Sequence, residues 1–433
     1  MPMSKEYQNR LFPILPEVVR YFDTPFIILD KVGIFETVEN MKVAFQDVND
    51  NYGFKQFFAL KTCPLPAILD IMRELNSGLD CSSKPELAMG RSVGFYGEEI
   101  IFSSNDTSQE EFKAALTNGG CILNLDDITM VKKVPKFPNL ICFRYNPEEC
   151  RSGNEIIGNP KEAKYGLRDD QVIPAYQQAI ERGAERFGLH TMICSNEINY
   201  KYMVETVQML LEVVERVSGA LGIKFEFINI GGGIGIPQRP GENPFNIQGL
   251  GREAKALLDQ FKQKYGYAPK LFTEYGRYIT GPHGALVARV INRMSKPREY
   301  VGLDASMVDF MRPGVYGEKV YHHITVLDKK GRPKEGPIEI VDVSGPMCEN
   351  NDKFAIQRSL PKVIDGDIII LEDAGAHGRA MGSNYNGRLR CQELLLGEDG
   401  NVEMVRRPET IEDYFATLKF GEKILKLNRK EVQ

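Results

Sequence analysis

Between about residues 28 and 285, short apolar runs alternate with longer amphipathic segments, and this alternation constrains the fold more than any other feature of the chain. Eight of the runs have the length of strands: QFFALK, GLDCSS, EIIFSS, CILNLDD, LICFRYNP, RFGLHTMI, FEFINIGGG and LFTEYGRYIT. Several are β-branched or aromatic on both faces, as expected of parallel strands that are buried on both sides. The segments between them carry apolar residues at steps of three and four, which is typical of helices. Strands and helices alternating over this length predict an α/β fold with a (β/α)8 barrel.

After about residue 285 the chain changes to strand-like runs joined by short turns such as DKKGRPKEG and GEDGN. This pattern predicts a C-terminal antiparallel β domain. The early run TPFIILD has no helix of the barrel type before it, so we expect it to join the second domain. We therefore predict a barrel over residues 28–285 and a β-rich domain made of residues 1–27 and 286–433.

The composition excludes several classes of function. The net charge of the 433 residues is −5, with acids and bases mixed, so we expect no nucleic-acid partner, which would require a clustered basic face. The longest apolar runs fall far short of the roughly 18 residues that span a bilayer, and no signal-peptide pattern is present, so we expect a cytoplasmic protein without a membrane anchor. The eight cysteines show no CxxC spacing and there are five histidines, so no metal site is expected.

Three strand ends carry residues that suggest chemistry. Lys61 ends the run QFFALK and would place an amine at the mouth of the barrel, where it is a candidate for a Schiff base, although an ordinary exposed lysine remains the alternative. Gly231, Gly232 and Gly233 follow FEFINI, and glycines let backbone N–H groups approach an anion closely, although a tight turn would also explain them. The next strand brings Glu274, for which a surface ion pair is the alternative. Together an amine, a phosphate cradle and a carboxylate suggest pyridoxal phosphate.

Motifs along almost the whole chain carry a family resemblance. They are FALK, INIGGGIGIP, EYGR in place of the family's EPGR, MRPGVYG, GPMCENNDKF, LPKVIDGD and DAGAHGRAMGSNYNGRLR. With these motifs in this order, the chain resembles the fold-type III pyridoxal-phosphate decarboxylases, the family of alanine racemase-like and ornithine decarboxylase-like proteins. Within it, the sequence looks most like diaminopimelate decarboxylase. The resemblance implies an alanine racemase-like barrel, a C-terminal β domain and pyridoxal 5'-phosphate as cofactor.

The same resemblance implies roles for individual residues at the reacting end. Lys61 would bind the cofactor as a Schiff base, and Cys348 would return a proton to the carbon that loses the carboxylate. The residues implied to contact the cofactor besides Lys61 are His190, Ser195, Gly231, Gly232, Gly233, Glu274, Tyr275, Gly276, Arg277 and His377. In the family two subunits share their active sites in a homodimer, so Cys348 would serve the partner subunit's Lys61. A small buried apolar residue remains the alternative for Cys348.

At the far end of the substrate, the residues implied by the resemblance are Arg277, Arg312, Tyr316, Glu349 and His377. Arginines form paired hydrogen bonds with a carboxylate, while Glu349 suits an ammonium group. Two arginines therefore favour an amino-acid substrate with a distal carboxylate, and the implied reaction is decarboxylation of meso-2,6-diaminopimelate to L-lysine.

Two departures from the family pattern affect the substrate. Met192 stands where the family has a histidine that stacks on the cofactor ring; His190, two residues earlier, is a substitute or else a core histidine. His377 replaces a tyrosine that reaches the active site. The alternatives are therefore a decarboxylase of D-ornithine, D-lysine or a carboxy-polyamine, and a catalytically silent regulatory homologue, which we would expect to have lost Lys61 or Cys348.

Overall fold

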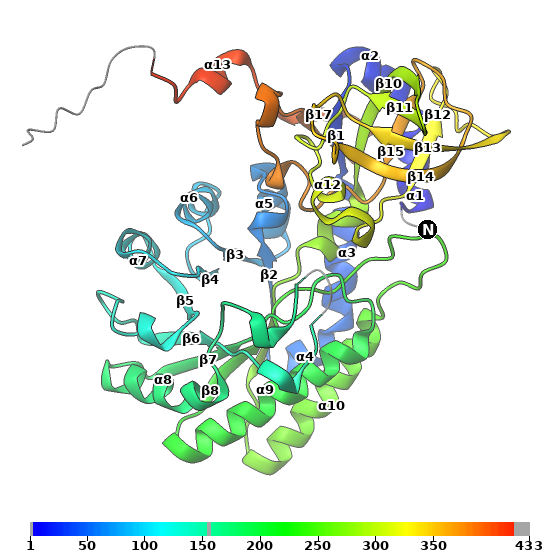
Figure 1. Ribbon diagram of the computed structural model, residues 1–433. Coiled ribbons are helices and arrows are strands. Elements are labelled where there is room, and N and C mark those ends of the chain that lie inside the picture. Colours follow the sequence, from blue (N-terminus) through cyan, green and yellow to red (C-terminus); the bar gives the residue numbers. More distant parts are fainter. Residues whose placement is uncertain (1–2, 154–156, 420–433) are drawn as a thin grey trace, which may run out of the picture.

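The larger body of the protein is a closed barrel of parallel strands, seen in a computed structural model that describes residues 3–153 and 157–419 (Figure 1). Pairing between the first and last strands closes the ring. The strands are β2 (Phe54–Ala59), β3 (Gly78–Cys81), β4 (Gly97–Phe102), β5 (Cys121–Leu125), β6 (Leu140–Arg144), β7 (Arg186–His190), β8 (Phe225–Asn229) and β9 (Lys270–Thr273). Each overlaps one of the eight runs that the sequence predicts as strands, so the predicted (β/α)8 barrel is confirmed.

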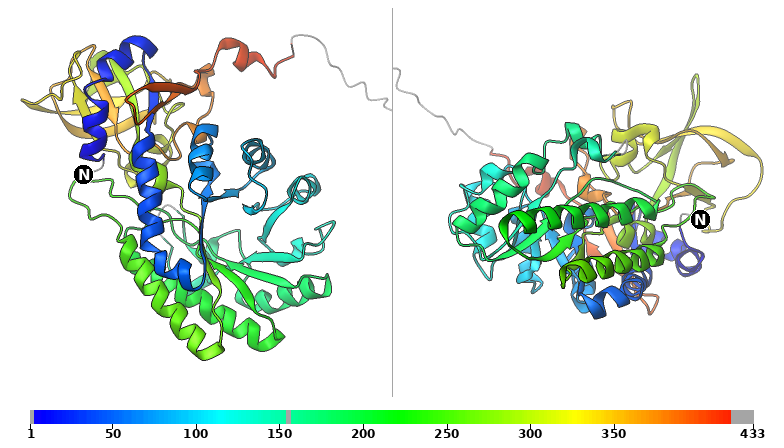
Figure 2. Two further views of the ribbon diagram at one scale, coloured as in Figure 1. Left: turned by 180° about the vertical axis from the view of Figure 1, so that it is seen from behind. Right: turned by 90° about the horizontal axis from the view of Figure 1, so that it is seen from below.

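Helices cover the outside of the barrel (Figures 1 and 2). They are α3 (Lys31–Ala44), α4 (Gln46–Asn51), α5 (Pro66–Glu74), α6 (Lys84–Ser92), α7 (Gln109–Leu116), α8 (Asp169–Glu181), α9 (Tyr200–Leu221), α10 (Ile247–Tyr265) and α11 (Arg277–Thr280). Helix α9 shows how the sequence sets their limits. It begins where the Asn199 side chain accepts the Lys201 N–H, and it ends at Gly222, whose φ of +70° favours glycine.

Phenylalanines fill the amino-terminal half of the barrel, and glycines on neighbouring strands make room for them. The rings of Phe227 and Phe272 stack with centroids 4.3 Å apart. A Cβ atom on Gly188 would lie 2.1 Å from Cζ of Phe227, and one on Gly78 would lie 2.4 Å from Cδ1 of Phe57. This packing closes one end of the barrel, so polar chemistry is confined to the carboxyl ends of the strands.

The second body is a mostly antiparallel sheet built from both ends of the chain. Its strands are β1 (Phe26–Asp30), β10 (Gly284–Ser295), β11 (Glu299–Leu303), β12 (Ile324–Leu327), β13 (Ile338–Ser344), β14 (Lys353–Pro361), β15 (Ile368–Leu371), β16 (Gln392–Leu396) and β17 (Val402–Arg406). Strand β1 pairs antiparallel with β10 and parallel with β16, so the run TPFIILD joins this sheet as predicted. Its helices are α1 (Lys5–Leu11), α2 (Leu15–Phe22), α12 (Arg312–Tyr316) and α13 (Ile411–Phe415).

The two bodies are joined by β1 and β10, which lead into and out of the barrel. The predicted domain limits at residues 28 and 285 fall inside these two strands and stay a prediction. Within the described residues, no helix combines the length and the apolar character that crossing a bilayer requires.

We expect Gly188→Ala to lower the unfolding free energy by about 1–3 kcal/mol, because the new methyl group would overlap the Phe227 ring inside a packed barrel. Chemical denaturation checks this. The matched control is Gly219→Ala in α9, where an added Cβ meets nothing within 4 Å and should stabilise the helix slightly. Equal effects of the two substitutions would contradict the packing argument.

Candidate active site

Charged side chains from distant parts of the sequence meet at the carboxyl end of the barrel. Lys61 lies in the turn after β2, and its Nζ is 3.9 Å from Oδ2 of Asp80 at the end of β3. Across the mouth, His190 ends β7 and its Nε2 lies 3.2 Å from Oε2 of Glu274, which follows β9. The structure thus brings together Lys61, His190 and Glu274, which the sequence predicts as site residues. The Lys61 side chain is 51% exposed, so its amine is open to a ligand.

Glu274 is a buried carboxylate that stays ionised because its neighbours stabilise the charge. Burial raises its pKa, but His190, Lys61 and the amide of Asn229 outweigh burial, and the net pKa lies below the ordinary value. Nδ2 of Asn229 donates to Oε1 of Glu274 over 2.7 Å. On the other side, Nδ2 of Asn124 lies 2.9 Å from Nδ1 of His190 and orients its ring. The site therefore holds a fixed negative charge in a nearly water-free position.

Asp80 has the opposite protonation state. Burial and, after it, the charge of Glu274 raise its pKa, Lys61 opposes both effects, and the net pKa is about 8. At neutral pH the protein therefore presents one ionised and one protonated carboxyl group beside the same lysine. Sequence analysis missed Asp80. The available signal was a single acid near the end of GLDC, a run whose other residues are not charged, at a position near the mouth of the barrel.

The glycine loop after β8 is folded so tightly that it leaves no space for side chains. Gly231 and Gly233 have φ values of +67° and +91°, which favour glycine. Added Cβ atoms on Gly231, Gly232 and Gly233 would lie 2.2–2.5 Å from carbonyl oxygens of residues 191, 274 and 194. The loop is therefore pressed between the ends of β7 and β9, with bare backbone facing the mouth. Gly276 makes a similar close approach, because its Cβ would lie 2.3 Å from Cγ2 of Thr62.

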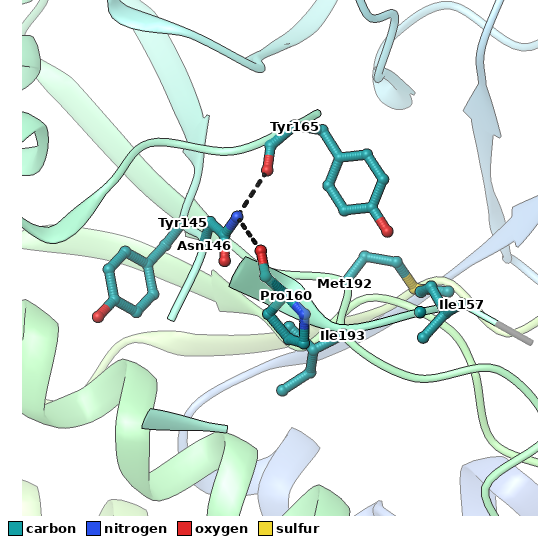
Figure 3. A pocket seen from close by; sticks show the side chains of 8 residues that line it. Tyr145, Asn146, Ile157, Pro160, Tyr165, Met192 and Ile193 are labelled. Atoms are coloured by element: carbon teal, nitrogen blue, oxygen red, sulfur yellow. Dashed lines mark hydrogen bonds between the residues drawn. The ribbon is translucent and has the colours of Figure 1, made fainter. Parts of the chain in front are cut away.

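Met192 contacts this loop directly. Its Sδ accepts the N–H of Gly232 over 3.3 Å, and its carbonyl accepts from Nη2 of Arg144 over 3.3 Å. The Arg144 guanidinium lies 3.7 Å from the ring centroid of Tyr165. Met192 and Tyr165 line a pocket of about 10 Å³ (Figure 3). Asn146 lines it too, and its side-chain amide donates to two backbone carbonyls. That volume has room for about one water molecule, so this pocket is not the substrate site.

A second cluster lies behind the mouth and contains two buried arginines. Arg277 is 7% exposed, and burial followed by the charge of Arg312 lowers its pKa to about 9. Arg312 is also buried, its Nε and Nη2 have no hydrogen-bond partner among the described residues, and its Cζ lies 5.3 Å from the Tyr316 ring. His377 donates its backbone N–H to the carbonyl of Thr62, next to Lys61. Burial lowers the pKa of His377 far below its usual range, and Arg277, Arg312 and Lys61 lower it further. The cluster is cationic, and N–H groups of Arg312 are available to hydrogen-bond a ligand.

Cys348 and Glu349 belong to the sheet domain and not to the strand ends at the mouth of the barrel. Cys348 is exposed in the connection between β13 and β14, where its N–H reaches Oδ1 of Asn386 over 3.3 Å. Oε1 of Glu349 accepts the N–H of Asn351 over 3.2 Å. In the part of the chain that the structure describes, no hydrogen bond or ion pair joins either residue to Lys61. An exposed thiol also rules out the alternative that Cys348 is a small buried apolar residue.

Two further predicted site residues have different surroundings. The Tyr275 side chain is 1% exposed and belongs to the hydrophobic core around the barrel, so only its backbone is near the mouth. Ser195 is half-buried in the loop after β7. The described residues contain no group of three or more histidine, cysteine or acidic side chains placed to hold a metal ion.

Comparison with known proteins identifies the family. A family model described as "Pyridoxal-dependent decarboxylase, pyridoxal binding domain" matches residues 35–281. The chain belongs to the pyridoxal-dependent decarboxylases. Diaminopimelate decarboxylase of Methanothermobacter thermautotrophicus is 32% identical over 408 residues, 92% of each chain. Protein TabA of Pseudomonas amygdali pv. tabaci is 44% identical over 415 residues, 96% of each chain.

The fold comparison gives the same family. The solved structure of diaminopimelate decarboxylase from M. jannaschii in co-complex with L-lysine superposes with a TM-score of 0.85 at 26% identity and covers 94% of each chain. This pyridoxal-dependent decarboxylase is thus a carboxy-lyase whose cofactor is pyridoxal 5'-phosphate.

The geometry of the mouth fits that cofactor. An exposed amine at Lys61 suits its aldehyde. The glycine loop suits its phosphate, because the loop has no side chains and no space for a Cβ atom. The ionised Glu274 suits its ring nitrogen, which a neighbouring negative charge keeps protonated. All three features lie at one end of the barrel.

The raised pKa of Asp80 predicts a pH dependence of stability in the decarboxylase without cofactor. The folded protein holds a proton on Asp80 up to a pKa of about 8, whereas the unfolded chain releases it near pH 4. This group therefore makes the folded state less stable as the pH rises between these values. We expect Asp80→Asn to flatten the fall in unfolding free energy between about pH 5 and pH 8, measured by urea denaturation.

The control for this experiment is Asp70→Asn, which removes an exposed acid on α5 and should leave the slope unchanged. An Asp80→Asn slope equal to that of the wild-type protein would show that Asp80 is not protonated in the folded state.

Proposed function

We propose that this enzyme decarboxylates a diamino acid that carries a second, distal carboxylate, and that its substrate is meso-2,6-diaminopimelate, which gives L-lysine and carbon dioxide. The pair of buried arginines, Arg277 and Arg312, carries this proposal. Their guanidinium groups are close enough for the charge of one to lower the pKa of the other, and Arg312 has two nitrogen atoms without a partner among the described residues. A carboxylate would neutralise the repulsion and satisfy the open N–H groups. The cytoplasmic location and the place in lysine biosynthesis belong to the same proposal.

The cofactor would be held at three points. Lys61 would bind its aldehyde through Nζ, the backbone of the loop Gly231 to Gly233 would bind its phosphate, and Glu274 would bind its ring nitrogen. In this structure the N–H groups of Gly231 and Gly232 donate to Oδ1 of Asn229 and Sδ of Met192, so they would exchange these partners for the phosphate. When bound, pyridoxal phosphate supplies an electron sink for the pair of electrons left when carbon dioxide departs. Two contacts in the structure keep Glu274 in place for this role, one from Asn229 and one from His190.

The distal cluster would orient the substrate so that its reacting end lies near Lys61. Arg277 and Arg312 would bind the distal carboxylate, and Tyr316, whose ring lies beside Arg312, would line the same space. His377 joins the two halves of the site. Its backbone N–H donates to the carbonyl of the residue after Lys61, and the charges of both arginines lower the pKa of its ring. Holding the far end fixes the near end, which is how binding energy away from the chemistry raises the rate.

The remaining two residues would come from a second subunit. Cys348 and Glu349 are accessible in a single chain and have no contact with Lys61 there. In a homodimer with shared sites, the partner subunit's Cys348 would deliver a proton to the carbon that lost its carboxylate, and the partner subunit's Glu349 would bind the distal ammonium. The sheet domain that carries both residues would then complete the neighbouring barrel.

One observation favours a different diamino acid. His377 stands at the position where the family has a tyrosine, and this replacement changes the wall of the proposed substrate site. D-ornithine, D-lysine or a carboxy-polyamine is therefore the second candidate class. The relative named TabA is the more identical of the two curated relatives compared above, and its name states no reaction.

Carbon dioxide release from the cofactor-loaded enzyme decides between the two classes. We expect turnover of meso-2,6-diaminopimelate, with little or none for D-lysine, L-lysine, D-ornithine, L-ornithine and carboxynorspermidine, because only the first offers a distal carboxylate to the arginine pair. Arg312→Gln should raise the KM for diaminopimelate about tenfold or more, the usual effect of losing a charge-assisted hydrogen bond. Preferred turnover of a substrate without a distal carboxylate would overturn the assignment.

Mixing two inactive variants tests the catalytic residues and the shared dimer together. Lys61→Ala should lose the visible absorbance of covalently bound cofactor, whereas Cys348→Ala should keep that absorbance and lose about a hundredfold or more in kcat. If subunits exchange at random and sites are shared, half of the dimers are mixed and one site in each is intact, so activity should return to about a quarter of the wild-type value. Activity that stays at the level of the separate variants would contradict sharing.

A further inference from the structure

A second pocket lies outside the site described above, between the loop that follows β8 and the sheet domain. Its volume is about 270 Å³. Arg239 comes from the loop that starts with the glycines of the cofactor site, while Lys353 and Arg358 come from β14. None of Lys61, Arg277 and Arg312 lines it. The pocket and the distal cluster share only α12, whose Pro313 contributes to the wall.

The pocket brings two guanidinium groups together around one aromatic ring, and Lys353 lines the same pocket with its Nζ 6.0 Å from the centroid of the Tyr300 ring. The guanidinium carbons of Arg239 and Arg358 lie 4.4 Å and 4.0 Å from the ring centroid of Tyr321. Arg358 is anchored there, because its Nη1 donates to the carbonyl of His322 over 2.9 Å. The amine of Lys353, on the same wall, has one polar contact among the described residues, to the amide oxygen of Asn350 over 3.3 Å.

No acid balances these charges in the described part of the chain. None of the residues that line the pocket is acidic, and no ion pair involves Arg239, Lys353 or Arg358 among the described side chains. The carboxylate next in sequence, Glu242, is occupied by the backbone N–H groups of Gln238 and Arg239, at 2.8 and 3.0 Å. Burial lowers the pKa of Arg358, and the charge of Arg239 lowers it further.

Like charges held this close repel one another unless an anion lies between them. Guanidinium and ammonium groups are the donors that bind phosphate and clustered carboxylates most strongly in proteins. The volume fits a small molecule and is too small for a folded segment of chain.

We propose that this pocket binds a small anion with at least two negative charges, a phosphate or a polycarboxylate, through Arg239, Lys353 and Arg358. The anion would join the loop that begins with the cofactor glycines to strand β14 of the sheet domain. This site is distinct from the cofactor and substrate sites.

Calorimetric titration of the cofactor-saturated enzyme with inorganic phosphate and, separately, with citrate tests the proposal at constant ionic strength. Cofactor saturation fills the phosphate site formed by the glycine loop. We expect at least one of the two anions to bind once per chain, and Arg239→Gln and Arg358→Gln each to weaken it about tenfold. Binding of phosphate alone identifies a phosphorylated ligand, and binding of citrate alone identifies a polycarboxylate.

Two control variants separate this pocket from other cationic surfaces. Arg252→Gln removes an exposed arginine of α10 and should bind as the wild-type protein does. Arg312→Gln removes an arginine of the distal cluster and should also leave anion binding unchanged. Arg239→Gln keeps the test independent of folding, because the Arg239 guanidinium is exposed and its one contact in the described structure is the Tyr321 ring.

Three results would overturn the proposal. Absence of binding by both anions to the wild-type enzyme is the first. The second is unchanged affinity in both Arg239→Gln and Arg358→Gln. The third is loss of binding in Arg312→Gln with retention in the two pocket variants, which would place the anion in the distal cluster.

Discussion

The buried carboxylate of Glu274 is the interaction on which the rest of the site depends. A negative charge with 6% exposure is costly unless it is stabilised; here Asn229 and His190 form hydrogen bonds with it, and the charge of Lys61 also stabilises it. The charge of Glu274 acts on Asp80 across the mouth and adds to the larger effect of burial, so that both raise the pKa of this second carboxyl group. One ionised group thus contributes to the protonation of the other, and the charge of Lys61 acts on both.

The parts that the sequence predicted correctly are those determined by local pattern. Strands buried on both faces are apolar along their whole length, so all eight barrel strands could be located, and the lack of a barrel-type helix pattern before TPFIILD indicated that this run joins the second sheet. The residues at the strand ends followed from the barrel rule, since Lys61, Glu274 and the glycines all stand where a strand stops. Hydrophobic periodicity and the positions of the strand ends were therefore sufficient to predict the fold, Lys61, Glu274 and the glycine loop.

The parts that the sequence could not give depend on contacts between distant residues. The raised pKa of Asp80 results first from burial and then from the charge of Glu274, a residue 194 positions later in the chain, and no pattern around position 80 records either. Met192 falls in the place of a stacking histidine, but only the structure shows that its sulfur accepts the Gly232 N–H and so supports the cofactor loop. The exposure of Cys348 is of the same kind, because the motif GPMCEN does not show whether the thiol is buried or accessible.

The charge balance of the distal cluster supports a substrate that carries a negative group at its far end. Asp373 is buried near Arg277, and burial followed by the charge of Glu372 raises its pKa, which weakens it as a counter-ion for the arginines. His377 is held neutral by burial and by the same arginines. Neither Arg277 nor Arg312 forms an ion pair with an acid among the described residues, and both lie in a space from which water is largely excluded. The side chain of lysine or ornithine would add a third positive charge there, whereas a distal carboxylate would cancel one charge and bind both arginines. The ammonium group beside that carboxylate would then need an acid of its own. The proposal of shared sites assigns this role to the partner subunit's Glu349, so the proposed substrate and the proposed dimer are linked by one charge arrangement.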